Sequence, residues 1–153
     1  MKISVIGAGN GGQAIAGYAS IKGYEVSLFD RNEAKVKRLQ EKGSIELRGL
    51  IKGDAHISLF TSNIGDAVAN ADLVMITTVA NAHAEVAKSM APYIKEGQII
   101  ILNPGRTCGA LVFKQALNEA GCNKRYYLGE AQTLILCEEG KKWEKSFLNP
   151  LLK

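Results

Sequence analysis

The chain is poor in the residues that build disulfide frameworks and metal sites. Its 153 residues include three cysteines and two histidines, and neither set has the spacing of a disulfide framework or a metal site. The odd number of cysteines favours free thiols, as in a cytoplasmic protein. The sequence also lacks a nucleophile elbow and internal repeats. We therefore expect no metal ion and place the protein in the cytoplasm.

Long apolar runs and strongly charged stripes are scarce as well. The N-terminal apolar run reaches only as far as the glycines that begin at residue 7, which is too short for a signal peptide or a membrane span. The net charge is a mild +4, without a basic stripe containing interleaved aromatic residues. We expect neither a membrane nor a nucleic acid as a partner. The 46% hydrophobic and 22% charged residues indicate one globular domain with a real core.

Short apolar strands alternate with helical segments along the chain. Strands are predicted at residues 2–6, 25–30, 72–77, 98–102 and 126–129, and helices at 10–21, 32–42, 63–69, 82–93 and 109–120. Residues 44–61 break this alternation with glycines between short alternating segments, which predicts a small antiparallel excursion inserted in the sheet. The pattern predicts an α/β fold of the Rossmann type, with a doubly wound, mostly parallel sheet.

A glycine-rich loop follows the first predicted strand. Residues 7–12, GAGNGG, fit the pattern G-x-G-x-x-G between a strand and a helix. We expect Gly7 to allow the tight turn, Gly9 to let the backbone approach a pyrophosphate, and Gly12 to let the helix pack closely on the sheet. The helix N-terminus offers N–H groups to phosphates. The glycine pattern predicts that this loop binds a dinucleotide. The alternative interpretation is a glycine-rich turn that binds no ligand.

An acidic residue ends the second predicted strand. Asp30 lies 18 positions after Gly12, where a carboxylate can accept hydrogen bonds from the adenosine ribose and repel a 2′-phosphate. Arg31 is either a solvated loop residue or a bidentate partner for such a phosphate. The pair favours NAD as the cofactor and leaves NADP possible.

Two other segments are expected at the same edge of the sheet, because each follows a predicted strand. Residues 77–83 include Thr78, and residues 103–107 include Asn103 and Arg106, although an ordinary loop is the alternative for the second segment. His83 is interpreted as a structural or solvated histidine and not as a catalytic one, since it has no acidic neighbour in the sequence. Glu130 is placed near this cleft by position alone.

These segments together resemble a known family. The strings GAGNGGQAIAGYASIKGYEVSLFDR, IELRGLIKGDAHI, TTVANAHAEVA, LNPGRTCGALVF and GEAQTL are similar to the N-terminal half of the opine (octopine/nopaline) dehydrogenases, over residues 2–134. The resemblance implies reductive condensation of an α-keto acid with the amine of an amino acid, with a nicotinamide dinucleotide as hydride donor. Glycerol-3-phosphate dehydrogenases and ketopantoate reductases share the fold and fit these strings less well.

The resemblance also assigns cofactor-binding residues by position. Gly7, Gly9, Asn10, Gly11, Gly12 and Gln13 would hold the pyrophosphate, Asp30 and Arg31 would face the adenosine ribose, and Asn103, Gly105 and Arg106 would lie near the nicotinamide, with Thr78 at the same edge.

The family pattern is not followed to the end of the sequence. Opine dehydrogenases continue into an all-helical second domain that carries the catalytic histidine–aspartate pair, and this domain is absent from the 153 residues. We expect an NAD(P)-binding domain over residues 1–134 and a divergent tail, helical or irregular, over residues 135–153. No catalytic residue is therefore assigned.

Three interpretations of function remain. The first is the cofactor half of an opine dehydrogenase, inactive alone, completed by a separate helical chain and prone to self-association through uncovered apolar surface. The second is a non-catalytic dinucleotide-binding module or a truncated remnant. The third is the cofactor domain of a ketopantoate reductase or a glycerol-3-phosphate dehydrogenase.

Overall fold

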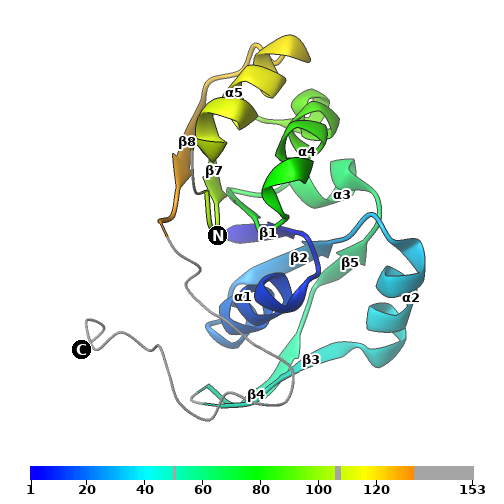
Figure 1. Ribbon diagram of the computed structural model, residues 1–153. Coiled ribbons are helices and arrows are strands. Elements are labelled where there is room, and N and C mark those ends of the chain that lie inside the picture. Colours follow the sequence, from blue (N-terminus) through cyan, green and yellow to red (C-terminus); the bar gives the residue numbers. More distant parts are fainter. Residues whose placement is uncertain (50, 106–107, 133–153) are drawn as a thin grey trace.

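The computed structural model describes residues 1–49, 51–105 and 108–132, and its centre is a parallel sheet of six strands (Figure 1). The strand order is β5-β2-β1-β6-β7-β8, and every pairing in this sheet is parallel. The strands are β1 (Lys2–Ile6), β2 (Glu25–Phe29), β5 (Leu59–Thr61), β6 (Leu73–Ile76), β7 (Gln98–Leu102) and β8 (Tyr126–Glu130). The predicted Rossmann-type fold is confirmed.

Helices cover both faces of the sheet, with α1 on one side and α3, α4 and α5 on the other (Figure 1). The helices are α1 (Asn10–Ile21), α2 (Glu33–Lys42), α3 (Ile64–Val68), α4 (His83–Met90) and α5 (Gly109–Glu119), with single 3₁₀ turns η1 (Ala80–Ala82) and η2 (Ala91–Tyr93). Two apolar clusters follow from this layering. Val5 faces the cluster beneath α1, and its neighbour Ile6 faces the cluster that includes Phe113 of α5. A strand buried on both faces explains the continuous apolar run in β1.

Local sequence signals fix the ends of α2 as expected. The Asn32 side chain accepts a hydrogen bond of 3.0 Å from the Lys35 backbone N–H, which caps the first turn. Gly43 ends the helix in the left-handed region, with a φ of +70°. The helix therefore begins directly after β2, beside the predicted ribose-binding carboxylate.

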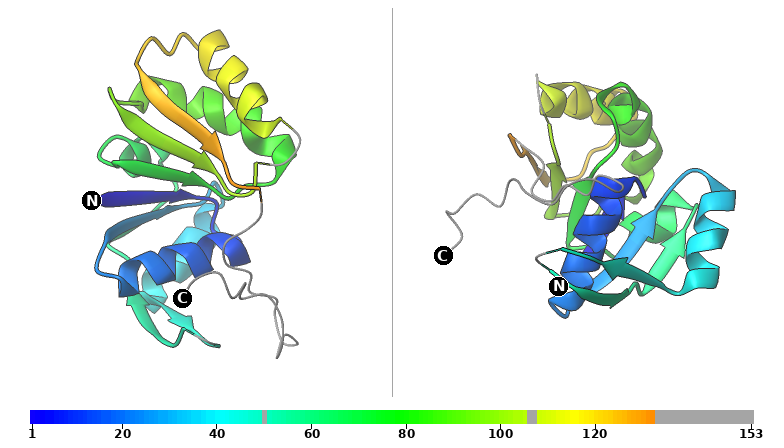
Figure 2. Two further views of the ribbon diagram at one scale, coloured as in Figure 1. Left: turned by 90° about the vertical axis from the view of Figure 1, so that its left-hand side faces the viewer. Right: turned by 60° about the horizontal axis from the view of Figure 1, so that its bottom comes forward.

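The antiparallel excursion is a hairpin of β3 (Ser44–Leu47) and β4 (Gly53–His56), which lies beside α1 (Figure 2). Leu47 covers Gly17 of α1, where a Cβ would lie 3.0 Å from the leucine side chain. The predicted antiparallel excursion is confirmed by this hairpin, and two details of it differ from the expectation. The hairpin is a separate two-stranded sheet, and β5 pairs in parallel with β2 in the main sheet. A strand of three residues is too short for its apolar pattern to show which strand it pairs with. Pairing with β2 buries Phe60, the middle residue of β5.

The described residues leave one face of the sheet partly uncovered at the β7–β8 side. Leu73, Ile99 and Tyr127 are neighbours in register across β6, β7 and β8, and Leu73 packs against the cluster beneath α1. Ile99 and Tyr127 continue this row with 41% and 70% of their surfaces exposed. The predicted tail, residues 135–153, lies outside the described residues. No helix among the described ranges is long and apolar enough to cross a membrane.

Candidate functional site

The predicted site residues gather at the carboxyl edge of the sheet. The strand order reverses beside β1, because β2 and β5 extend the sheet on one side of β1 and β6, β7 and β8 extend it on the other. Parallel α/β sheets bind ligands at such a switch point. The glycine loop follows β1, Asp30 follows β2, Thr78 follows β6 and Asn103 follows β7. Arg106 lies outside the described residues.

The three expected glycine roles correspond to three different geometries. Gly7 has a φ of +111°, a conformation that side chains rarely adopt. At Gly12 a Cβ would overlap the Gly7 carbonyl oxygen and lie 2.7 Å from Thr77 Oγ1. At Gly9 a Cβ would meet no atom of the other described residues within 4 Å. Gly7 and Gly12 are therefore required by the fold itself, whereas the space beside Gly9 is open to a ligand.

A threonine that was not predicted ties the glycine loop to β6. The Thr77 hydroxyl lies 3.0 Å from the Ile6 carbonyl oxygen and 2.9 Å from the Gly7 carbonyl oxygen, either of which can accept its proton. The sequence places Thr77 at the end of a strand, but only the fold shows which carbonyls its side chain reaches. Thr77 holds the turn in place from the neighbouring strand.

The first turn of α1 presents backbone donors at the open side of the loop. The first helical hydrogen bond runs from Gln13 N to the Gly9 carbonyl oxygen at 2.9 Å, so the helix supplies no acceptor for the amides of Asn10, Gly11 and Gly12. The positive end of the helix dipole adds to their attraction for an anion. Gln13 donates from Nε2 to the Ala8 carbonyl oxygen at 2.9 Å, which braces the loop.

Asp30 is a buried carboxylate with three donors around it. Oδ2 accepts from Lys35 Nζ at 2.7 Å and from Ala8 N at 3.1 Å, and Oδ1 accepts from Asn32 N at 3.0 Å. Burial alone would raise the pKa of Asp30, but these hydrogen bonds and the Lys35 charge outweigh it and lower the pKa below 3.8. Asp30 is therefore ionised at neutral pH, and it joins β2 to the glycine loop.

Arg31 lies on the outer side of this edge. Its Nη1 is 3.4 Å from Glu85 Oε2 of α4, and the two side chains are 78% and 70% exposed. Such exposed pairs contribute about 0–1 kcal/mol. Arg31 is thus free to exchange this partner for another anion at little energetic cost.

Two side chains after β6 and β7 have buried polar atoms that find no hydrogen-bond partner among the described residues. These atoms are Oγ1 of the partly buried Thr78 and both the oxygen and the nitrogen of the fully buried Asn103 amide. An unpaired buried polar group costs about 1–3 kcal/mol. Both residues follow strands that end at the same edge of the sheet as the glycine loop, so these atoms are available to a ligand bound at that edge.

The loop after β7 has room only for a glycine at position 105, and Glu130 has a structural role beside it. A Cβ at Gly105 would overlap Glu130 Cβ and lie 2.9 Å from Leu102 Cβ. The Glu130 carboxylate accepts a hydrogen bond of 2.9 Å from Ala110 N, in the first turn of α5. Glu130 therefore caps a helix at this edge, an arrangement its sequence position alone did not reveal.

Neither histidine lies where it could act as a general acid or base at this site. His83 is 2% exposed, and its Nε2 lies 3.2 Å from the Thr78 carbonyl oxygen, to which it donates in the matching tautomer. His83 has no acidic partner in the described part of the chain. His56 ends β4 beside Ser20, near the last turn of α1. At 1.5 Å per residue, Ser20 lies about 15 Å along the helix from its N-terminus.

Known proteins share both the sequence and the fold. The model for the NAD binding domain of 6-phosphogluconate dehydrogenase matches residues 2–111. The opine dehydrogenase of Arthrobacter sp. (strain 1C) is 43% identical over 133 residues, which cover 86% of this chain and 37% of that protein. A glycerol-3-phosphate dehydrogenase [NAD(P)+] of Fusobacterium nucleatum is 32% identical over 104 residues, covering 66% of this chain and 30% of that protein.

Solved structures agree in fold. An octopine dehydrogenase structure described with NADH and pyruvate has a TM-score of 0.76 at 22% identity, covering 90% of this chain and 37% of that one. A ketopantoate reductase from Ralstonia eutropha has a TM-score of 0.67 at 21% identity, covering 84% of this chain and 40% of that one. The chain spans less than half the length of each of these relatives.

The fold and the glycine loop define a Rossmann-type domain that binds a nicotinamide dinucleotide. The chain belongs to the family of NAD binding domains typified by 6-phosphogluconate dehydrogenase. The expected resemblance to the NAD(P)-binding domain of opine dehydrogenases is confirmed by the sequence identity, and the fold agrees with it.

Proposed function

We propose that the carboxyl edge of the sheet holds the dinucleotide through three groups of residues. The amides of Asn10, Gly11 and Gly12 take the pyrophosphate, Asp30 takes the adenosine ribose, and Thr78 and Asn103 take the nicotinamide end. The open space at Gly9 beside these free amides carries the proposal. The family resemblance adds Gly7 and Gln13 at the pyrophosphate, Arg31 at the adenosine ribose, and Gly105 and Arg106 at the nicotinamide end.

Cofactor binding is the first expected result. Titration of the 153-residue chain with NADH, followed by nicotinamide fluorescence or calorimetry, should give a saturable one-site curve in the micromolar range, about −8 kcal/mol for a Kd near 1 μM. Bound NADH should also raise the melting temperature, because only the folded state binds it. A flat titration up to millimolar NADH would refute the assigned site.

We also propose that this domain serves the reductive condensation of an α-keto acid with an amino acid. The 43% identity to an opine dehydrogenase supports this assignment over the glycerol-3-phosphate dehydrogenase alternative, whose relative is 32% identical over fewer residues. In that reaction the keto carbonyl and the amine lose water to form an imine. Reduced nicotinamide then supplies a hydride to the imine carbon, and a proton completes the secondary amine.

The described residues lack the groups that such a reaction needs beside the cofactor. Holding the imine against the hydride donor accounts for roughly 7–11 kcal/mol of barrier lowering, and the proton requires a positioned acid. His83 is buried against the Thr78 carbonyl, and no described carboxylate pairs with it. We propose that residues 1–134 form the cofactor domain, and that another polypeptide surface covers the apolar row ending at Tyr127. A separate helical chain and a second copy are the candidate occupants.

The 153-residue chain alone is therefore expected to bind NADH without oxidising it. The assay mixes the chain and NADH with panels of α-keto acids, pyruvate first, and amino acids, and follows absorbance at the nicotinamide band. Parallel fluorescence titration shows that cofactor is bound. Turnover above the enzyme-free rate that disappears in a folded His83→Gln variant would instead make this chain a complete enzyme.

A further inference from the structure

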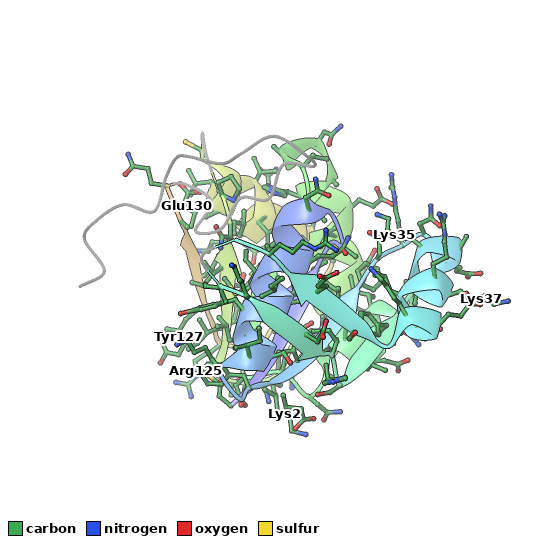
Figure 3. All side chains as sticks on the ribbon, turned by 90° about the horizontal axis from the view of Figure 1, so that it is seen from below. Lys2, Lys35, Lys37, Arg125, Tyr127 and Glu130 are labelled. Atoms are coloured by element: carbon green, nitrogen blue, oxygen red, sulfur yellow. The ribbon has the colours of Figure 1, made fainter. Side chains whose placement is uncertain are left out.

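The predicted ribose-binding carboxylate is already engaged by a lysine of α2. Lys35 Nζ lies 2.7 Å from Asp30 Oδ2, and the two side chains are 39% and 11% exposed. Two backbone amides, those of Ala8 and Asn32, donate to the same carboxylate. Figure 3 shows that Lys35 and Lys37 leave α2 in different directions, with Lys37 pointing outward. Lys35 is the side chain of this helix that is anchored at the site.

This contact changes the electrostatic argument for cofactor choice. A free carboxylate beside the ribose repels a 2′-phosphate, which disfavours NADPH. A cation 2.7 Å from that carboxylate cancels most of the repulsion at the distance of a bound phosphate. An ammonium on a flexible four-carbon stem has three donors, so it can retain Asp30 while contacting a phosphate, or turn from one to the other.

Arg31 is less well placed for this role. Its guanidinium is directed toward Glu85 of α4 and is 78% exposed, so solvent weakens its pull on an anion. Lys35 is the less exposed of the two cations and is already held against the carboxylate that faces the ribose.

We propose that Lys35 sets the cofactor selectivity of this domain. It pairs with Asp30 when a ribose 2′-hydroxyl is bound and engages the 2′-phosphate when NADPH is bound, so that the chain accepts both cofactors. This inference rests on the proposed function of the same site.

The test compares two lysine substitutions on one helix. Lys35→Met removes the ammonium at Asp30, and Lys37→Met removes the same charge from an exposed position of α2. Dissociation constants for NADH and NADPH are measured by fluorescence at one ionic strength, with thermal unfolding as a folding check. The parent should prefer NADH by less than about tenfold. Lys35→Met should widen this preference by at least about tenfold, mainly through weaker NADPH binding, which is the size of one lost charge-assisted contact.

The remaining outcomes decide the inference. Lys37→Met should change the ratio of the NADH and NADPH dissociation constants by less than twofold. An equal effect of both substitutions would mean that Lys35 acts only through the net charge of the domain. Equal weakening of NADH and NADPH by Lys35→Met would make it a structural partner of Asp30 only. A parent chain that binds NADH but excludes NADPH would overturn the inference and leave the proposed function intact. A parent that binds neither cofactor would refute the proposed function.

Discussion

Gly12→Ala is expected to destabilise the domain by about 3 kcal/mol or more, which lowers the melting temperature by roughly 10 °C. The added Cβ would overlap the Gly7 carbonyl oxygen, and this backbone is held by its turn and by Thr77. Alanine favours a helix over glycine by only about 1 kcal/mol. The clash therefore dominates, because backbone atoms cannot move aside as a flexible side chain can.

The matched control is Gly9→Ala, which places the same methyl group in the same loop. Because a Cβ at Gly9 meets nothing within 4 Å in the described part of the chain, the only expected loss is that of a glycine cap, about 1 kcal/mol. Thermal and urea unfolding followed by circular dichroism measure both variants. Equal melting temperatures for Gly12→Ala and Gly9→Ala would mean that the approach of α1 to Gly7 is not a requirement of the fold.

Gly9→Val is expected to fold and to bind NADH about 100-fold more weakly than the parent. The valine side chain would fill the open space beside the amides of Asn10 and Gly11, so phosphates could not reach them. Loss of two hydrogen bonds to a charged group, at about 1.5 kcal/mol each, gives this factor. Fluorescence titration with NADH measures the constant.

The folded state of Gly9→Val is checked by its unfolding curve, and Gly9→Ala should give an intermediate affinity. A Gly9→Val variant that binds NADH as tightly as the parent would show that the pyrophosphate does not bind at this loop. Weaker NADH binding by a variant with a nearly parental unfolding curve would separate binding from stability, since this position is predicted to tolerate a side chain in the absence of ligand.

Backbone requirements were predictable because they act locally. A positive φ at Gly7, the cap at Asn32 and the end of α2 at Gly43 each depend on a few consecutive residues. The alternation of apolar strands with helices gave the bounds of α1 and β7 and the parallel sheet. The position of Asp30 just after β2 followed from the same alternation, because the apolar run that predicts the strand stops at this charged residue.

Contacts between elements were not predictable in this way. Nothing in the spacing of Asp30 and Lys35 shows that the lysine folds back across the first turn of α2. The Thr77 hydroxyl reaches the glycine loop only because β6 pairs with β1. The partner of β5 and the lack of partners for the Asn103 amide likewise depend on the assembled sheet. These features depend on tertiary packing, which cannot be predicted from the sequence of one strand or one loop alone.

The hydrogen bond from Ala8 N to Asp30 has a consequence for redesign of the cofactor preference. The Asp30 carboxylate accepts a hydrogen bond from the glycine loop and, in the proposed site, also faces the adenosine ribose. Replacing Asp30 to admit a phosphate would therefore also loosen the loop that every dinucleotide needs. Variants at Asp30 would thus lose affinity for both cofactors while changing their ratio. Lys35 touches the carboxylate from outside the loop, so an engineer who wants selectivity without a general loss of binding should begin there.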